Sequence, residues 1–248
     1  MTYNLIGDIH GRNSWRQLVR TDMINIFLGD YLDPYDRDNL QADSTEYDNL
    51  QDIIRFKQQH PETILLLGNH DLHYLWDEHY SRYNDERAER YAQLIREHLH
   101  LFQAAYAIGD RVLVTHAGVT RPWLQLAGIS HQQSVSQLAE AICRCMSDEE
   151  SRHLFSVEST FHPDDSCGIS PTASPIWVRP HTLLDYSALT NHHGDTIYQV
   201  VGHTQIGQIM QFDSCVFVDC LGSVPQSLRI TFDAAGEPIF TPLPAKIQ

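Results

Sequence analysis

Five short segments of this sequence combine glycine with residues that bind metals or carry protons: GDIHG at 7–11, GDYLD at 29–33, GNHD at 68–71, THAG at 115–118 and GHTQ at 202–205. A single glycine–aspartate turn after a strand is a common structural feature, because glycine reaches positive φ and aspartate bonds its own backbone. Five such segments along one chain predict a common chemical site in addition to turns. Carboxylate, amide and imidazole groups that meet at one point are typical ligands of a divalent transition metal. They are less typical of calcium or of a metal bound by thiolates.

The elements that must position these segments can be read from the apolar pattern. Apolar runs with the length of buried strands lie at 3–6, 23–28 and 63–67, and helical periodicity at 14–20 and 45–59 separates them. The chain is therefore predicted to begin as β-α-β-α-β. Because the carboxyl ends of strands in an open α/β sheet share one edge, we expect the segments to converge there.

Antiparallel strands and further helices are expected later in the chain. The stretch AAYAI-GD-RVLVT alternates around Gly109 and Asp110 and predicts a β-hairpin after a helix at 84–102. A helical region at 119–156 follows it. Four short strands are then expected, at 197–201, 208–212, 216–219 and 228–232. We expect an α/β (α+β) fold in one domain over residues 1–248, with 119–180 as a cap or substrate-recognition insertion.

Composition argues against several classes of protein. The 248 residues carry a formal charge of −15, which disfavours nucleic acid and anionic lipid as partners. The sequence shows no apolar run near the ~20 residues of a membrane span and no signal-peptide pattern, so we expect a cytoplasmic protein without a membrane partner. Five scattered cysteines indicate neither a disulfide framework nor a zinc ribbon. Histidines outside the five segments, including His73, His79 and His98, are interpreted as surface or capping residues.

The order of the five motifs resembles the calcineurin-like metallophosphoesterases, and within them the phosphoprotein-phosphatase branch, which includes serine/threonine phosphatases and diadenosine tetraphosphatases. The motifs run from Gly7 to Gln205 and cover most of the chain. The resemblance implies a four-layer αββα sandwich, with two mixed sheets flanked by helices and two divalent metals at the strand ends. The implied ligands are Asp8 and His10 on the first metal, Asp30 bridging both metals, and Asn69, His116 and His203 on the second.

The chemistry implied by this ligand set is hydrolysis of a phosphate ester by a metal-bridging hydroxide. Two cations ~4 Å apart lower the pKa of a shared water and bind two phosphate oxygens. By resemblance, His70 is the general acid that protonates the leaving group, and Asp33 orients its imidazole. Manganese is the expected metal, with iron, zinc, cobalt and nickel as alternatives, because cellular availability overrides ligand type.

Phosphate binding also requires fixed positive charge, and a guanidinium matches two oxygens better than an ammonium does. The stretch PIWVRP resembles the family's tryptophan-x-arginine segment, which implies that Arg179 clamps the phosphoryl group. The chain departs from the family pattern at Pro34, where the motif GD-x-x-DRG has an arginine. We regard Arg12 and Arg37, which lie close to the motifs, as candidate substitutes for it. Gln205 replaces the last histidine of GH-x-H, so the first metal site is expected to be the weaker one.

The sequence therefore predicts a dinuclear-metal phosphatase that acts on phosphate monoesters, with a phosphorylated small molecule or a phosphoserine or phosphothreonine protein as substrate. One alternative is a dinucleoside polyphosphate hydrolase with a base pocket in the 119–180 region. Another, of a different class, is a metal-bound scaffold or sensor with weak activity. The presence of His70 and Asp33 argues against the scaffold, because a scaffold needs no general acid. The sequence leaves the substrate, the native metal and the oligomeric state open.

Overall fold

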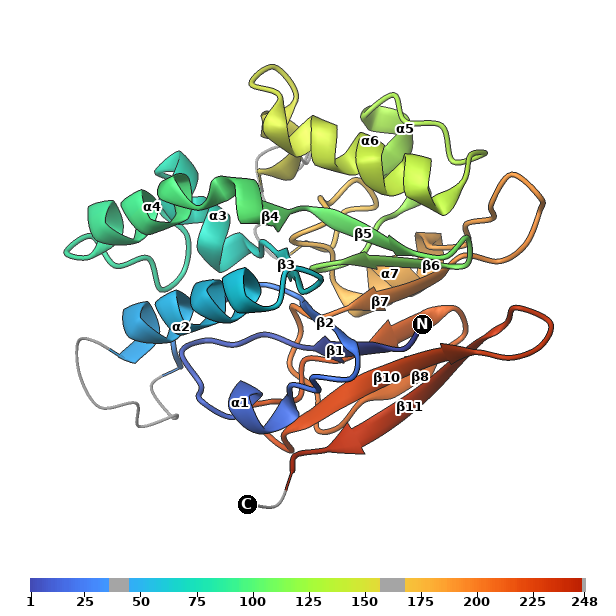
Figure 1. Cartoon of the computed structure of the whole chain (residues 1–248). Coiled ribbons are helices and arrows are strands. Elements are labelled where there is room, and N and C mark those ends of the chain that lie inside the picture. Colours follow the sequence, from blue (N-terminus) through green and yellow to red (C-terminus); the bar gives the residue numbers. More distant parts are fainter. Residues whose placement is uncertain (36–44, 157–167, 247–248) are drawn as a thin grey trace.

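Two mixed β-sheets lie at the centre of the computed structural model, which describes residues 1–35, 45–156 and 168–246 (Figure 1). The first sheet contains β1 (Tyr3–Ile6), β2 (Ile24–Phe27), β3 (Ile64–Leu66), β4 (Phe102–Gln103), β10 (Gln226–Phe232) and β11 (Pro238–Pro244), in the order β11-β10-β1-β2-β3-β4. The second contains β5 (Ala105–Ile108), β6 (Val112–Thr115), β7 (Tyr198–Val201), β8 (Met210–Phe212) and β9 (Cys215–Phe217), in the order β5-β6-β7-β9-β8. Strands β1 to β4 pair in parallel, as do β6, β7 and β9, so their carboxyl ends can meet.

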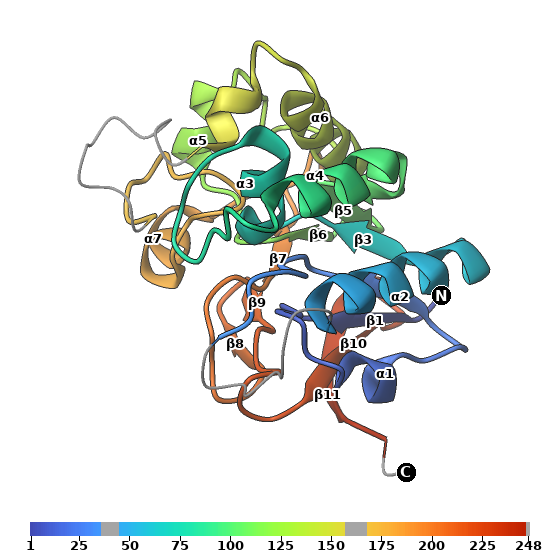
Figure 2. The same cartoon turned by 90° about the vertical axis from the view of Figure 1, so that its left-hand side faces the viewer.

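Helices cover the outer faces of both sheets. On the side of the first sheet lie α1 (Trp15–Leu18) and α2 (Thr45–Gln59), and above the second lie α5 (Arg121–Leu126) and α6 (Val135–Ser147) (Figures 1 and 2). Three further helices are α3 (Asn69–Trp76), α4 (Ala88–Glu97) and α7 (Pro180–Tyr186). The order helix, sheet, sheet, helix confirms the predicted four-layer sandwich.

Side-chain alternation along the strands builds two apolar layers. Leu5 and Ile26 belong to the cluster that the two sheets share, whereas the neighbouring Ile6 and Phe27 pack outward with residues such as Trp15 of α1. Both faces of β1 and β2 are thus buried, which explains why these strands form continuous apolar runs in the sequence. Burying each such side chain contributes about 1.5–3 kcal/mol, so the strand ends that carry the motifs are firmly held.

The boundaries of several elements match their predicted ranges, and four elements, α3, β4, α7 and β11, were not predicted. Strand β1 and helix α2 have the predicted bounds, and the expected hairpin is formed by the antiparallel pair β5 and β6. The helix predicted over 84–102 is shorter, because α4 ends at Glu97 and a 3₁₀ turn at Leu99–Leu101 follows. Strand β11 was missed because it contains three prolines, which an edge strand tolerates since one side of it needs no ladder hydrogen bonds. Helix α7 was also missed.

The region 119–180 contributes helices α5 and α6, of which α6 packs against β5 and β6. Part of this region therefore forms the outer layer of the second sheet. Its role as a cap or in substrate recognition stays a prediction. Among the described residues, every helix is too short or too polar to cross a membrane.

Candidate metal centre and active site

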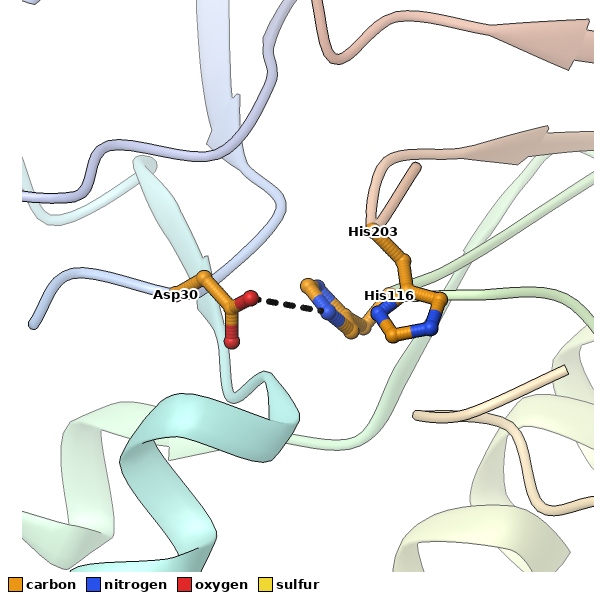
Figure 3. A group of neighbouring side chains, drawn as sticks. All are labelled: Asp30, His116 and His203. Carbon is orange, nitrogen blue, oxygen red and sulfur yellow. Dashed lines mark ion pairs between the residues drawn. The ribbon is translucent and has the colours of Figure 1, made fainter. Parts of the chain in front are cut away.

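The polar strand ends converge on a single cluster between the two sheets. Asp8 and His10 follow β1, Asp30 follows β2, Asn69 begins α3 after β3, His116 follows β6 and His203 follows β7. We call these six residues the ligand cluster. Potential ligand atoms of Asp8, His10 and Asp30 lie within 4.8 Å of one another, and the same holds for Asp30, His116 and His203 (Figure 3). Asp30 belongs to both groups.

Distances within the ligand cluster are those of groups that face a common point. Asp30 Oδ2 lies 3.6 Å from His10 Nε2 and 3.4 Å from His116 Nε2. Asn69 Oδ1 lies 3.1 Å from His116 Nε2 and 3.0 Å from His203 Nδ1. The backbone N–H of His203 donates to both carboxylate oxygens of Asp8 at 3.0 Å. All six side chains are buried, with at most 8% of any residue exposed.

Backbone carbonyls orient the three imidazoles of the ligand cluster. One ring nitrogen of each histidine lies 2.7–3.1 Å from a main-chain oxygen, His10 Nδ1 from Leu32, His116 Nδ1 from Leu28 and His203 Nε2 from Trp177. A ring nitrogen bonded to a carbonyl oxygen must carry the proton, so in the neutral ring that binds a metal the other nitrogen keeps its lone pair. Those lone pairs face the oxygens of Asp30 and Asn69, an arrangement that a cation between them stabilises. The residues present therefore fit a divalent metal.

Charge and burial shift the pKa values in the same cluster. Burial lowers the pKa of His10 to about 3 and lowers that of His203 well below its usual range, so both imidazoles are neutral, as metal ligands must be. For His116, burial opposes the charge, but the Asp30 and Asp8 carboxylates outweigh burial and raise the pKa to about 10. Without a metal, His116 thus keeps a proton where a divalent cation would sit.

Backbone strain is concentrated at the site. His10, Asp30, Asp33 and His203 all have positive φ values, of 44°, 49°, 56° and 64°. Non-glycine residues in this region cost of order 1–3 kcal/mol each and persist where the surrounding structure holds them in place. The sharp turns that follow β1, β2 and β7 are therefore part of how the fold aims these side chains.

Two glycines of the motifs are required by the ligands themselves. A Cβ on Gly68 would lie 2.1 Å from Asp30 Oδ1, and one on Gly202 would lie 2.2 Å from Asp8 Oδ1. Asp71, the last residue of GNHD, adds a further support, because its buried carboxylate accepts the backbone N–H groups of Asp30 and Gly68 at 2.8 and 2.9 Å. The motif GNHD thus positions the Asp30 turn as well as contributing Asn69.

His70 and Asp33 form a hydrogen-bonded pair beside the ligand cluster. His70 Nδ1 lies 2.7 Å from Asp33 Oδ2, and the His70 ring centroid lies 5.4 Å from that of His10. Tyr74 O–H donates to Asp33 Oδ1. Burial of Asp33 favours its neutral form, but the bonds from His70 and His73 outweigh burial and lower the pKa of Asp33, so it stays a carboxylate.

The interpretation of His73 as a surface or capping residue is wrong. His73 is 1% exposed, and its Nε2 lies 2.8 Å from Asp33 Oδ2. It follows His70 by three residues, so both imidazoles lie on one face of α3 and reach the same carboxylate. That i, i+3 spacing is the signal by which the sequence could have identified it.

The three arginines predicted to bind phosphate differ in where they lie relative to the ligand cluster. Arg179 begins α7 as its N-cap residue, donates to Thr204 Oγ1 at 3.2 Å, and its charge contributes to the lowered pKa of His203, so it lies beside the ligand cluster. Arg12 is 7% exposed and donates to the Asp8 carbonyl oxygen at 3.5 Å. Arg37 lies outside the described residues.

Two residues near the cluster were not predicted. Asp219 is fully buried and, after burial, is the largest cause of the raised pKa of Asp8. The strand expected at 216–219 ends on this aspartate, so the rule that identified the other motifs would have found it. Arg82 lies in the connection between α3 and α4, and its Nη2 lies 2.7 Å from His70 Nε2. Arg82 belongs to no strand-end motif, so the sequence carried no signal for it.

A buried cluster of carboxylate, amide and imidazole groups at the strand ends of a two-sheet sandwich defines a metallophosphoesterase, which is a phosphoric ester hydrolase. The chain belongs to the family of calcineurin-like phosphoesterases, whose family model matches residues 1–207. Proteins of this family generally use a dinuclear divalent metal centre, which agrees with the two groups that share Asp30.

Solved structures of other proteins are similar to this one. A serine/threonine phosphatase from Saccharomyces cerevisiae with similarity to human phosphatase PP5 aligns over 100% of this chain and 81% of its own, with 14% identity and a TM-score of 0.52. A protein described as a 5′-nucleotidase from Staphylococcus aureus aligns over 100% of this chain and 54% of its own, with 12% identity and a TM-score of 0.42. The first similarity supports the fold. No curated protein matches the chain at a significant level.

Proposed function

We propose that this chain hydrolyses phosphate monoesters with two divalent metal ions, acting on a phosphorylated small molecule or on phosphoserine or phosphothreonine in a protein. The observation that carries the proposal is the position of Asp30. Its Oδ2 faces His10 and His116 at 3.6 and 3.4 Å, so one carboxylate is shared by both candidate ligand groups. A shared carboxylate is what holds two cations at the separation needed for phosphate chemistry.

In this proposal, the first metal is held by Asp8, His10 and Asp30, and the second by Asp30, Asn69, His116 and His203. When bound, the two ions supply a water of lowered pKa and neutralise phosphate charge. Manganese is the proposed metal, because mixed nitrogen and oxygen ligands suit it and no thiolate of the described residues belongs to either group. Asp219 adds a buried negative charge next to Asp8, which favours a cation in the first group, where Gln205 stands in place of a histidine.

We assign the general acid to His70. Because Nδ1 is bonded to the Asp33 carboxylate at 2.7 Å, Nε2 is the nitrogen that must carry the proton for the leaving group. Asp33 keeps this tautomer and stabilises the imidazolium form. Arg179, beside His203, is assigned to a phosphoryl oxygen, where its planar guanidinium can bond two oxygens. Arg12 is a weaker candidate for the same task, since its guanidinium already donates to the Asp8 backbone.

A substrate comparison tests this proposal. Metal-stripped protein is titrated with manganese while phosphate release is measured from an aryl phosphomonoester, the matching diester and diadenosine tetraphosphate. We expect manganese-dependent turnover of the monoester, and none in Asp30→Asn. Preference for the dinucleotide would replace the proposal with the polyphosphate hydrolase. Bound manganese without turnover of any substrate would favour the scaffold or sensor.

A further inference from the structure

Arg82 makes three contacts next to His70 and Asp33, which together with the side chains that contact them form what we call the acid side of the site. Its Nη1 donates to the backbone carbonyl oxygen of Asp33 at 2.6 Å, and its Nη2 lies 2.7 Å from His70 Nε2. The guanidinium carbon lies 3.8 Å from the ring centroid of Tyr35, within the range of a cation–π contact. Arg82 itself is half-buried and lines a pocket together with Asp33, Pro34 and Tyr35.

The charge of Arg82 has no carboxylate partner among the described residues. Both oxygens of the nearby Asp33 already contact the side chains of other residues, His70 and His73 at Oδ2 and Tyr74 at Oδ1. Arg82 bonds only the carbonyl oxygen of Asp33, which is a neutral acceptor. A guanidinium without an ion-pair partner beside a buried catalytic group is the arrangement that binds an anion.

The contact with His70 shows where that anion belongs. His70 Nδ1 bonds Asp33, so Nε2 is the nitrogen that faces Arg82. The Nη2 donor of Arg82 therefore points to the place where a leaving oxygen must lie to be protonated by His70. The other oxygens of the same phosphoryl group would then lie within reach of the guanidinium.

The backbone at Arg82 is strained, which supports a role in the site. Its φ is 68°, and it is the only arginine among the positive-φ residues that the structure describes. Such strain costs of order 1–3 kcal/mol and is concentrated at functional sites, where His10, Asp30, Asp33 and His203 share it in this protein. Pro34, directly after Asp33, has no side-chain donor, and among the described residues Arg82 of the α3–α4 connection brings a positive charge to this side of the site.

We propose that Arg82 binds the phosphoryl group of the substrate beside His70 and that Tyr35 positions its guanidinium. The inference rests on the proposed phosphatase function. Tyr35 is suited to the positioning role because its ring contacts Arg82 on the acid side and the His10 ring at 4.9 Å on the metal side. Substrate binding would move Nη2 from His70 Nε2 to a phosphoryl oxygen, with no covalent change at Arg82.

The test uses inorganic phosphate as the probe and manganese-loaded protein. Phosphate affinity is measured by calorimetry, and kcat/KM by turnover of an aryl phosphomonoester. Arg82→Gly is the main variant, because glycine relieves the strain of φ 68° while removing the charge. We expect phosphate affinity and kcat/KM to fall about 10- to 100-fold, the effect of losing a bond to a charged group. Metal content should not change, and Tm should stay equal or rise.

Two further variants complete the test. Arg82→Lys should recover part of the phosphate affinity, because lysine keeps the charge and loses the planar fork. Arg90→Ala is the matched control, since Arg90 is an exposed arginine of α4 whose guanidinium carbon lies 3.7 Å from the ring centroid of Tyr47 on α2, outside the site. It should leave both measurements unchanged.

The two proposals fail in different ways. Unchanged phosphate affinity in Arg82→Gly would overturn the role of Arg82, whatever the turnover shows. A lower Tm with unchanged affinity would assign Arg82 a structural role only. Absence of monoester turnover in the unmodified protein would overturn the proposed function, and the phosphate measurement would still decide the role of Arg82.

Discussion

The ligand cluster and the acid side of the site are held in different ways. In the ligand cluster, each imidazole lies within bonding distance of a backbone carbonyl oxygen, and Gly68 and Gly202 leave only enough space for the carboxylates of Asp30 and Asp8. On the acid side, most of the contacts are between side chains. Asp33 is contacted by His70, His73 and Tyr74 from α3, and Arg82 reaches His70 from the following connection.

This difference indicates which part of the site can be substituted without loss of the metals. Backbone-anchored ligands depend on the sharp turns at the strand ends, so a substitution there disturbs the fold and the metals together. The acid side depends on a network in which one donor can be supplied from another element, as Arg82 illustrates next to Pro34. We expect substitutions on the acid side to alter rate and phosphate affinity while the metals stay bound.

Gly68→Ala should have the largest effect, because it disrupts the ligand cluster directly. The new Cβ would lie 2.1 Å from Asp30 Oδ1 and 2.7 Å from His116 Cε1. We expect manganese binding to be lost and kcat/KM to fall about 10³-fold, the scale of several kcal/mol supplied by the metals. Metal analysis and monoester turnover check this. Gly207→Ala, whose Cβ meets nothing within 4 Å, is the matched control. An active Gly68→Ala with full metal content would refute the backbone-anchored account.

His70→Asn tests the acid side of the site while leaving the six residues of the ligand cluster unchanged. We expect kcat to fall about 10²-fold, the usual contribution of a general acid, with manganese content unchanged. The loss should be larger for an aryl phosphate with a poorer leaving group, because such a leaving group needs the proton more. If the metal content falls with the activity, His70 belongs functionally to the ligand cluster and the division drawn here is wrong.

Metal affinity should depend on pH through the ligand cluster. Asp30 and Asp8 raise the pKa of His116 to about 10 in spite of its burial, so at neutral pH a metal must displace that proton. The affinity for manganese is therefore expected to rise at least about tenfold per pH unit as the pH increases toward that value. Competition with a metal indicator at several pH values measures it. An affinity that is constant with pH would show that His116 binds no proton in the metal-free protein.

Tyr74→Phe should have the smallest effect, because it removes one neutral donor to Asp33. We expect kcat to fall about two- to tenfold, which corresponds to one net hydrogen bond, with metal content unchanged. Tyr83→Phe is the matched control, since Tyr83 O–H donates to Asp77 at 2.9 Å on the exposed side of the same aromatic cluster. Equal losses in both variants would mean that the effect comes from packing and not from Asp33.

The comparison also explains how much the sequence could predict. Most of the strands, their parallel order and the convergence of the six polar side chains could be predicted, because buried strands form apolar runs and a polar motif at the end of each is placed by local backbone geometry. Strand β11 was missed because its prolines conceal an edge strand. Asp219 could have been found by the strand-end rule. His73 and Arg82 could not be placed by that rule, because their roles depend on how α3 and the connection after it pack against the Asp33 turn.

The most direct test of the central claim is the manganese content of the purified, metal-saturated protein and of Asp30→Asn, determined together with monoester turnover. If Asp30 is shared by two metals, the unmodified protein should bind two manganese ions per chain, and Asp30→Asn should bind fewer and lose its turnover. One ion per chain in the unmodified protein, or two ions and full turnover in Asp30→Asn, would contradict the account.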